Sequence, residues 1–174
     1  MKIFENTRRK LHPLPILSNL QDFLKATAGA ADHRPGLLAL DVSRKAIGVA
    51  GADAAWRMAT PLTTIRRTRL AADIERLRSL LAERDAEALV VGLPLNMDGS
   101  EGPRCQAIRQ FAKDVDAALG LPILLWDERL TTFEAGERAD ALGLKGKKRT
   151  DLLDALAASL ILEDVIRAMQ RPRA

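Results

Sequence analysis

The chain has 174 residues, a formal net charge of +4 and 47% hydrophobic residues, which suffices for the core of one domain. Aromatic residues make up only 3% and tyrosine is absent, which argues against a surface that binds nucleic acid by stacking many bases. The single cysteine, Cys105, excludes an internal disulfide and a cysteine-based zinc site. Both histidines, His12 and His33, lie near the N-terminus, so chemistry in the rest of the chain must rest on carboxylates.

Residues 1–36 differ from the rest of the chain in carrying six basic side chains, three acidic side chains and three prolines. Residues 19–28 predict a short helix with apolar side chains, including Phe23, on one face. We expect residues 1–36 to form a basic, partly ordered extension that adds little to the core, and residues 37–174 to form the folded domain. No apolar run is long enough to cross a bilayer, and no secretory signal is present, so we expect a cytoplasmic protein that contacts no membrane.

Regular hydrophobic patterns begin after this extension. Strands are expected at residues 37–41, 47–50, 56–65, 88–92 and 121–126, and helices at 68–84, 103–119, 132–142 and 149–169. The first three strands follow one another as a meander, and the later strands alternate with helices, which favours parallel additions through right-handed crossovers. The order predicts an α/β fold with a mixed sheet and helices on both faces.

Four acidic residues stand at positions where such folds place their sites. Asp41 ends the first strand, Asp127 and Glu128 end the last strand, and Asp154 lies among small residues of the last helix. Carboxylates that converge repel one another unless a divalent cation lies between them, and oxygen-rich sites suit Mg²⁺ or Mn²⁺. Carboxylates that hold paired metal ions are a recurring solution for phosphodiester hydrolysis.

Each acid also has a purely structural interpretation that the residues alone leave open. Asp41 is compatible with a turn, and Asp127 with a cap on the following helix. Asp127 and Glu128 before Arg129 are compatible with a surface ion pair, and Asp154 with an ordinary solvent-facing helix position.

Five segments occur in an order and at separations that carry a resemblance: LLALDVSRKAIGVA, TPLTTI, VVGLPLNMDGSEG, DERLTT and DALAASLIL. Together they span roughly residues 37–169 and resemble the YqgF family, also called RuvX. The resemblance implies an RNase H-like fold and a metal-dependent nuclease that acts in 5′-end maturation of pre-16S ribosomal RNA, bound to that RNA and to ribosomal precursor particles. It also relates the chain to Holliday junction resolvases, which act on branched DNA.

The resemblance assigns the acidic positions to catalysis and to binding of Mg²⁺ or Mn²⁺; these are Asp41, Asp127, Glu128 and Asp154. Lys45 and Arg129 match family positions. Asn96 lies in the turn-rich loop 93–102, before a helix whose first N–H groups suit a phosphate, although a plain connection explains the loop as well. Three further cations suit a nucleic-acid backbone, although a solvated loop explains them too; these are Lys145, Lys147 and Lys148.

The segment after Asp41 departs from the family pattern. Ser43 replaces a usual glycine and Ala46 replaces a basic or polar residue, so we expect altered geometry beside Asp41. Two functions other than an RNA nuclease stay open: a resolvase of branched DNA, and a non-enzymatic module that binds nucleic acid or the ribosome. An actin-like ATPase, which the first segment also suggests, needs far more residues.

Overall fold

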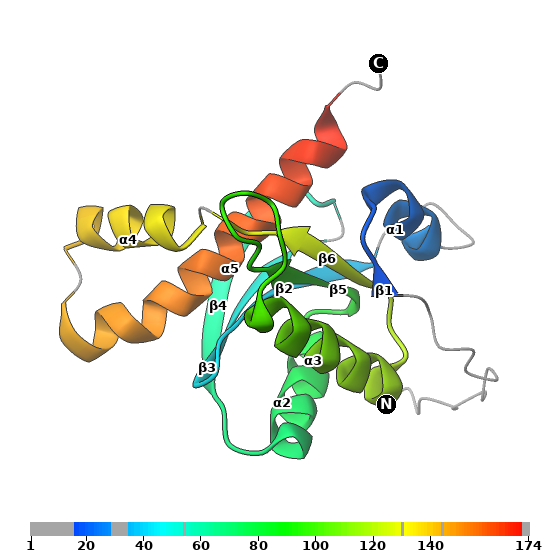
Figure 1. Ribbon diagram of the computed structural model, residues 1–174, viewed down its shortest axis with the longest axis horizontal. Coiled ribbons are helices and arrows are strands. Elements are labelled where there is room, and N and C mark those ends of the chain that lie inside the picture. Colours follow the sequence, from blue (N-terminus) through cyan, green and yellow to red (C-terminus); the bar gives the residue numbers. More distant parts are fainter. Residues whose placement is uncertain (1–15, 29–34, 54, 130, 144, 172–174) are drawn as a thin grey trace.

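The computed structural model describes residues 16–28, 35–53, 55–129, 131–143 and 145–171. It contains one six-stranded sheet in the order β1-β6-β5-β2-β3-β4 (Figure 1). The strands are β1 (Ile16–Leu17), β2 (Gly36–Val42), β3 (Ala46–Ala52), β4 (Ala59–Arg66), β5 (Ala86–Leu93) and β6 (Ile123–Asp127). The helices are α1 (Leu20–Thr27), α2 (Leu70–Glu83), α3 (Pro103–Leu119), α4 (Thr131–Ala141) and α5 (Gly146–Gln170).

The sheet is mixed. Strands β2, β3 and β4 form an antiparallel meander, and β5, β6 and β1 add to β2 in parallel. The carboxyl ends of β2, β5 and β6 therefore meet at one edge of the sheet, where Leu93 pairs with Asp127. These features confirm the predicted RNase H-like α/β fold with a three-stranded meander and parallel strands.

Helices cover both faces of the sheet, as predicted, because side chains of each strand alternate between two apolar clusters. Leu38, Leu40 and Val42 of β2 pack with α2 and α3 on one face. Leu37 and Ala39 pack with α5 on the other, and α4 lies against α5 (Figure 1). In the described part of the chain, no helix has both the length and the apolar character needed to span a bilayer.

Helix α5 crosses β3 at very close range. A Cβ atom added at Gly48 would overlap the backbone carbonyl of Asp154, so only glycine permits the helix to lie there. The adjacent helix residues Ala155 and Ala158 are buried and small. Since Gly48 pairs with Asp41 in the antiparallel ladder, the crossing brings Asp154 of α5 beside Asp41 of β2.

The described part of the N-terminal extension adds to the core, contrary to the expectation. Strand β1 pairs with β6 and is the outermost strand on that side of the sheet. Phe23 of α1 is fully buried in the cluster beneath α5. Asn19 caps this helix by accepting hydrogen bonds from the backbone N–H groups of Gln21 (2.8 Å) and Asp22 (3.1 Å). Residues 1–15 lie outside the described residues.

Two elements begin three residues away from their predicted starts, each for a local reason. Strand β4 begins at Ala59 rather than at Trp56, because Trp56 has a φ of 47° and its buried indole N–H donates to the Pro35 carbonyl at 2.8 Å. Helix α5 begins at Gly146 rather than at Arg149, so the basic stretch forms the first turn of the helix instead of a loop.

We expect Phe23→Ala to lower the free energy of unfolding by about 3–5 kcal/mol, because the substitution leaves a cavity in the cluster that α1 shares with the sheet. Urea denaturation of the full chain measures the loss. Gln21→Ala, on the exposed side of the same helix, serves as the control and should change stability by less than about 0.5 kcal/mol. Equal stability of the two variants would show that α1 contributes nothing to the core.

Candidate active site

Two acidic side chains meet at the edge where the parallel strands end. The carboxyl groups of Asp41 and Glu128 share a hydrogen bond. Glu128 follows β6, its backbone N–H donates to the Leu93 carbonyl at 3.2 Å, and its side chain is 7% exposed. A Cβ atom at Gly92 would overlap the Glu128 carboxyl group, so a glycine on β5 makes the space that this side chain occupies.

Asp154 is the third acid at this place, carried there by the close crossing of α5. Its negative charge acts on Asp41 directly. Asp127 contributes charge to Glu128, but its own carboxylate accepts hydrogen bonds from the Arg129 side chain at 2.8 Å and backbone N–H at 3.1 Å. Of the two neighbouring acids, Glu128 is therefore the one that faces Asp41, while Asp127 is paired with Arg129.

The surroundings disfavour ionisation of both inner carboxyls. Burial, and then the charge of Asp41, raise the pKa of Glu128 to about 8. Burial, and then the charge of Asp154, raise the pKa of Asp41 to about 6. The positive charge of Arg104 lowers both pKa values in part. Near neutral pH, the pair accordingly retains a proton between two carboxyl groups.

The chemistry of this donor set fits a divalent cation. Asp41, Glu128 and Asp154 offer only oxygen atoms, as Mg²⁺ and Mn²⁺ prefer. The raised pKa values of Asp41 and Glu128 reflect burial and the repulsion of neighbouring negative charges. Among the described residues, however, no group of three or more acidic, histidine or cysteine side chains is arranged as a formed metal site. The acids are close enough to interact electrostatically without constituting a completed ligand cage.

The Ser43 departure from the family pattern is accommodated in the turn between β2 and β3. The Ser43 hydroxyl accepts a hydrogen bond from the Ala46 N–H at 3.1 Å and donates to the Ala46 carbonyl at 3.0 Å. Among the described residues other than glycine, a positive φ occurs only at Trp56 and Asp85, so this turn does not need the conformation that glycine allows. Lys45 lies exposed in the same turn.

The loop after β5 is held by its own polar groups. Asn96 donates from its side-chain amide to the Ser100 hydroxyl at 2.9 Å, and Asp98 accepts from the Ser100 N–H at 2.9 Å. Gly102, not Ser100, is the N-cap residue of α3, and no side chain caps that helix. Asn96 and Arg129 line a cavity of about 310 Å³ together with Glu128, so both predicted nucleic-acid-binding residues lie beside this acid.

The predicted basic residues lie in the first turn of α5 and at its N-cap. Lys145 is the N-cap residue, and Lys147 and Lys148 line a cavity of about 530 Å³ with Thr63 and Arg66 of β4. Lys147 precedes Asp154 by seven residues, which is two helical turns or roughly 10 Å on the same face.

Sequence reasoning missed Arg104. It is the second residue of α3, and its charge acts on both Asp41 and Glu128. Its position at the start of a helix that follows a glycine-containing loop was the available signal, because such helix starts gather at the carboxyl edge of an α/β sheet.

We expect Glu128→Gln to stabilise the protein at pH 8 in EDTA by roughly 1–3 kcal/mol, because the buried carboxylate loses its charge while the amide still donates to Asp41. A carboxyl whose pKa rises on folding stabilises fully below its unfolded value of about 4.5 and loses that contribution as the pH rises through the folded value of about 8. The difference from the unmodified protein should therefore grow between pH 5 and pH 8. Urea denaturation across this range measures it.

Glu87→Gln supplies the control for this measurement, because Glu87 is exposed on β5. It should leave stability unchanged at every pH. A Glu128→Gln protein less stable than the unmodified protein at pH 8 would contradict the assignment of an uncompensated acid pair.

Comparisons with known proteins agree over most of the chain. A family model described as "RuvX: Holliday junction resolvase" matches residues 36–168. A "Putative pre-16S rRNA nuclease" from Novosphingobium aromaticivorans is 52% identical over 133 residues, covering 76% of this chain and 85% of that protein. One of the same name from Cereibacter sphaeroides is 45% identical over 152 residues, covering 87% and 92%.

Among solved structures, Thermus thermophilus RuvC matches with a TM-score of 0.48 and 16% identity, covering 77% of this chain and 96% of that one. The family match extends from the first residue of β2 to within two residues of the end of α5, and thus includes every element that carries an acid of the site. On this range and these identities, the chain belongs to the RuvX family.

Proposed function

We propose that this protein is a metal-dependent nuclease that hydrolyses a phosphodiester bond in 5′-end maturation of pre-16S ribosomal RNA. The observation that carries the proposal is the half-buried carboxyl of Asp41, hydrogen-bonded to the buried Glu128 beside Asp154 at the carboxyl edge of the sheet. Relatives that are 41–52% identical over most of the chain carry the pre-16S rRNA nuclease name, which supports RNA as the substrate.

The three acids would hold Mg²⁺ or Mn²⁺ through carboxylate oxygens. When bound, the cation supplies Lewis-acid stabilisation of the charge that builds on the phosphoryl oxygens. Asp41 stands on β2, which has neighbouring strands on both sides. Glu128 is held by its backbone bond to β5, and Asp154 by the packing of α5 on Gly48.

The protonation of Asp41 and Glu128 would also depend on the cation. Without a cation, Asp41 and Glu128 retain a proton between them near neutral pH, which limits the repulsion of two buried carboxylates. Asp41 and Glu128 would both have to be carboxylates to hold a cation, so they would have to release this proton. Activity should therefore increase with pH across the range in which Glu128 ionises.

Basic residues around the acids would carry the RNA backbone. Lys147 and Lys148 would contribute charge from the first turn of α5, and Lys45 from the β2–β3 turn. Arg129 is tied to Asp127 and to the Met97 carbonyl, so its contribution would be to hold the loop after β5 in place.

We expect Asp41→Asn and Asp154→Asn each to reduce cleavage of a pre-16S rRNA fragment by at least about a hundredfold, while the fold survives. Each variant removes one of the charges that would hold the cation. Single-turnover assays with Mg²⁺ or Mn²⁺ measure the rate, and circular dichroism checks the fold.

Asp116→Asn is the matched control for these variants. Asp116 is likewise a buried carboxyl with a raised pKa, caused by burial, but it lies twelve residues, or roughly 18 Å, along α3 from Arg104. It should cleave at the normal rate. Cleavage that persists in EDTA, or in Asp41→Asn, would reject the mechanism.

A triple variant with alanine at Lys145, Lys147 and Lys148 should bind RNA more weakly and with a flatter dependence on salt concentration. The reason is that a complex with fewer phosphate contacts releases fewer condensed counterions. The rate at saturating RNA should change little, since none of the three touches the acids. Binding curves at two salt concentrations decide the point. Unchanged affinity at both would show that the three lysines are merely solvated.

The same assays separate the remaining functions. The family description, Holliday junction resolvase, makes a four-way DNA junction the substrate to compare with pre-rRNA. Cleavage of the junction alone would favour the resolvase. Tight binding of either nucleic acid without metal-dependent cleavage would favour a binding module.

A further inference from the structure

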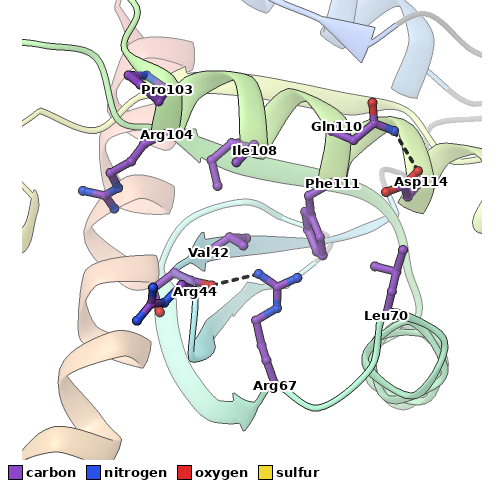
Figure 2. Close-up of a pocket in the computed structure, with 12 residues that line it drawn as sticks. Val42, Arg44, Arg67, Leu70, Pro103, Arg104, Ile108, Gln110, Phe111 and Asp114 are labelled. Carbon is purple, nitrogen blue, oxygen red and sulfur yellow. Dashed lines mark hydrogen bonds between the residues drawn. The ribbon is translucent and has the colours of Figure 1, made fainter.

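A cavity of about 680 Å³ lies between the β2–β3 turn, the segment leading into α2, and α3 (Figure 2). This volume falls within the range of roughly 300–1,000 Å³ that ligand sites occupy. Its walls are mainly apolar and come from three elements; they include Val42, Leu70, Ile108 and Phe111. Neither Asp41, Glu128 nor Asp154 lines it.

The cavity nevertheless opens at the same edge of the sheet as the acids. Asp41 and Val42 are consecutive residues of β2, so their side chains point to opposite faces, Val42 toward α2 and α3. Arg104 connects the two places, because it lines the cavity while its charge acts on both Asp41 and Glu128. A strand of RNA passing over this edge would have one phosphate at the acids and the next nucleotide at the cavity.

Three arginines line the cavity, and one of them has a structural task. Arg67 donates from Nε to Asp73 at 3.3 Å and from Nη1 to the Ser43 carbonyl at 2.9 Å, and its guanidinium lies 5.4 Å from the centre of the Phe111 ring. These contacts fix the Arg67 plane as part of the cavity wall. Its charge is already matched by Asp73.

Arg44 and Arg104 remain for a ligand. Within the ranges that the structure describes, neither has an ion-pair partner within 4 Å, and both residues are exposed. Figure 2 shows them at one end of the cavity, with Gln110 and Asp114 at the other, joined by a hydrogen bond of 2.9 Å. The cavity thus has a cationic end, an apolar middle and a polar far end.

A nucleotide has the same sequence of chemical properties: an anionic phosphate, the apolar faces of a base, and a polar base edge. We propose, on the basis of the nuclease function above, that this cavity binds one unpaired nucleotide of the RNA next to the phosphodiester that is cleaved. Arg44 and Arg104 hold its phosphate, and the base lies against Ile108, Phe111 and the fixed plane of Arg67. The cavity therefore positions the strand and selects single-stranded RNA.

Ala107→Glu tests the cavity without removing a core contact. Ala107 lines the cavity from the exposed side of α3, and a glutamate there would both fill the space and repel a phosphate. Ala117→Glu is the matched control, because it adds the same charge to an exposed position of the same helix that does not line the cavity.

The first readout needs neither metal nor cleavage. Adenosine 5′-monophosphate is titrated into the full chain in EDTA, and backbone amide shifts are followed by NMR, with ribose 5-phosphate as the probe that lacks a base. We expect the mononucleotide to shift Arg44, Ile108 and Phe111, with an affinity about tenfold above that of ribose 5-phosphate. Ala117→Glu should behave like the unmodified protein, and Ala107→Glu should lose the difference between the probes.

Equal shifts with both probes would show that the cavity binds only an anion and not a base. No shifts at these residues would show that it binds no nucleotide. Either result overturns the proposal. The second readout is cleavage, where Ala107→Glu should raise KM about tenfold with little change in kcat. If the unmodified protein cleaves RNA and Ala107→Glu keeps its KM, the cavity proposal fails while the nuclease stands. If no RNA is cleaved, the nuclease fails and the titration still decides the cavity.

Discussion

The close crossing of α5 over β3 at Gly48 is the contact on which the arrangement of the site depends. A side chain at this position would meet the backbone of Asp154, so any larger residue would lift the helix from the sheet. The consequences extend along α5 in both directions. Asp154 would leave Asp41, the lysines of the first turn would leave β4, and α4, which packs against α5, would move with it.

A second glycine likewise makes room for an acid of the site, Glu128. Gly92 of β5 leaves the space that the Glu128 carboxyl occupies, and this carboxyl is buried next to Asp41. Such a pair lowers the stability of the empty protein, because burial and mutual repulsion oppose its ionisation. The apolar clusters on both faces of the sheet must offset that cost. Such a concentration of negative charge is what the proposed cation site would need in order to attract its ion.

Positive charge surrounds this negative centre on more than one element. Arg104 stands at the start of α3, Lys45 in the turn after β2, and Lys147 at the start of α5. A polyanion approaching bare carboxylates would be repelled, so under the proposed function these cations would offset that repulsion and let a phosphate reach the acids. In the same way, the cavity beside Arg104 would contact a base of the RNA in addition to the phosphate backbone. It uses aliphatic walls, one ring and one fixed guanidinium plane, which a chain with few aromatic residues can still supply.

The sequence by itself determined the mixed α/β sheet, the strand-end positions of Asp41 and Glu128, and the family. Strand patterns and strand-end acids are local features, because alternation and turn residues act over a few positions. It did not reveal that Asp127 pairs with Arg129 while its neighbour Glu128 faces Asp41, since adjacent side chains part only once the chain after β6 is anchored to Leu93. It also did not reveal the core role of Phe23, which depends on β1 joining β6 across more than 100 residues of chain. The cavity was likewise decided only by tertiary structure, because its lining comes from β2, α2 and α3, and no local pattern encodes which distant segments a fold brings together.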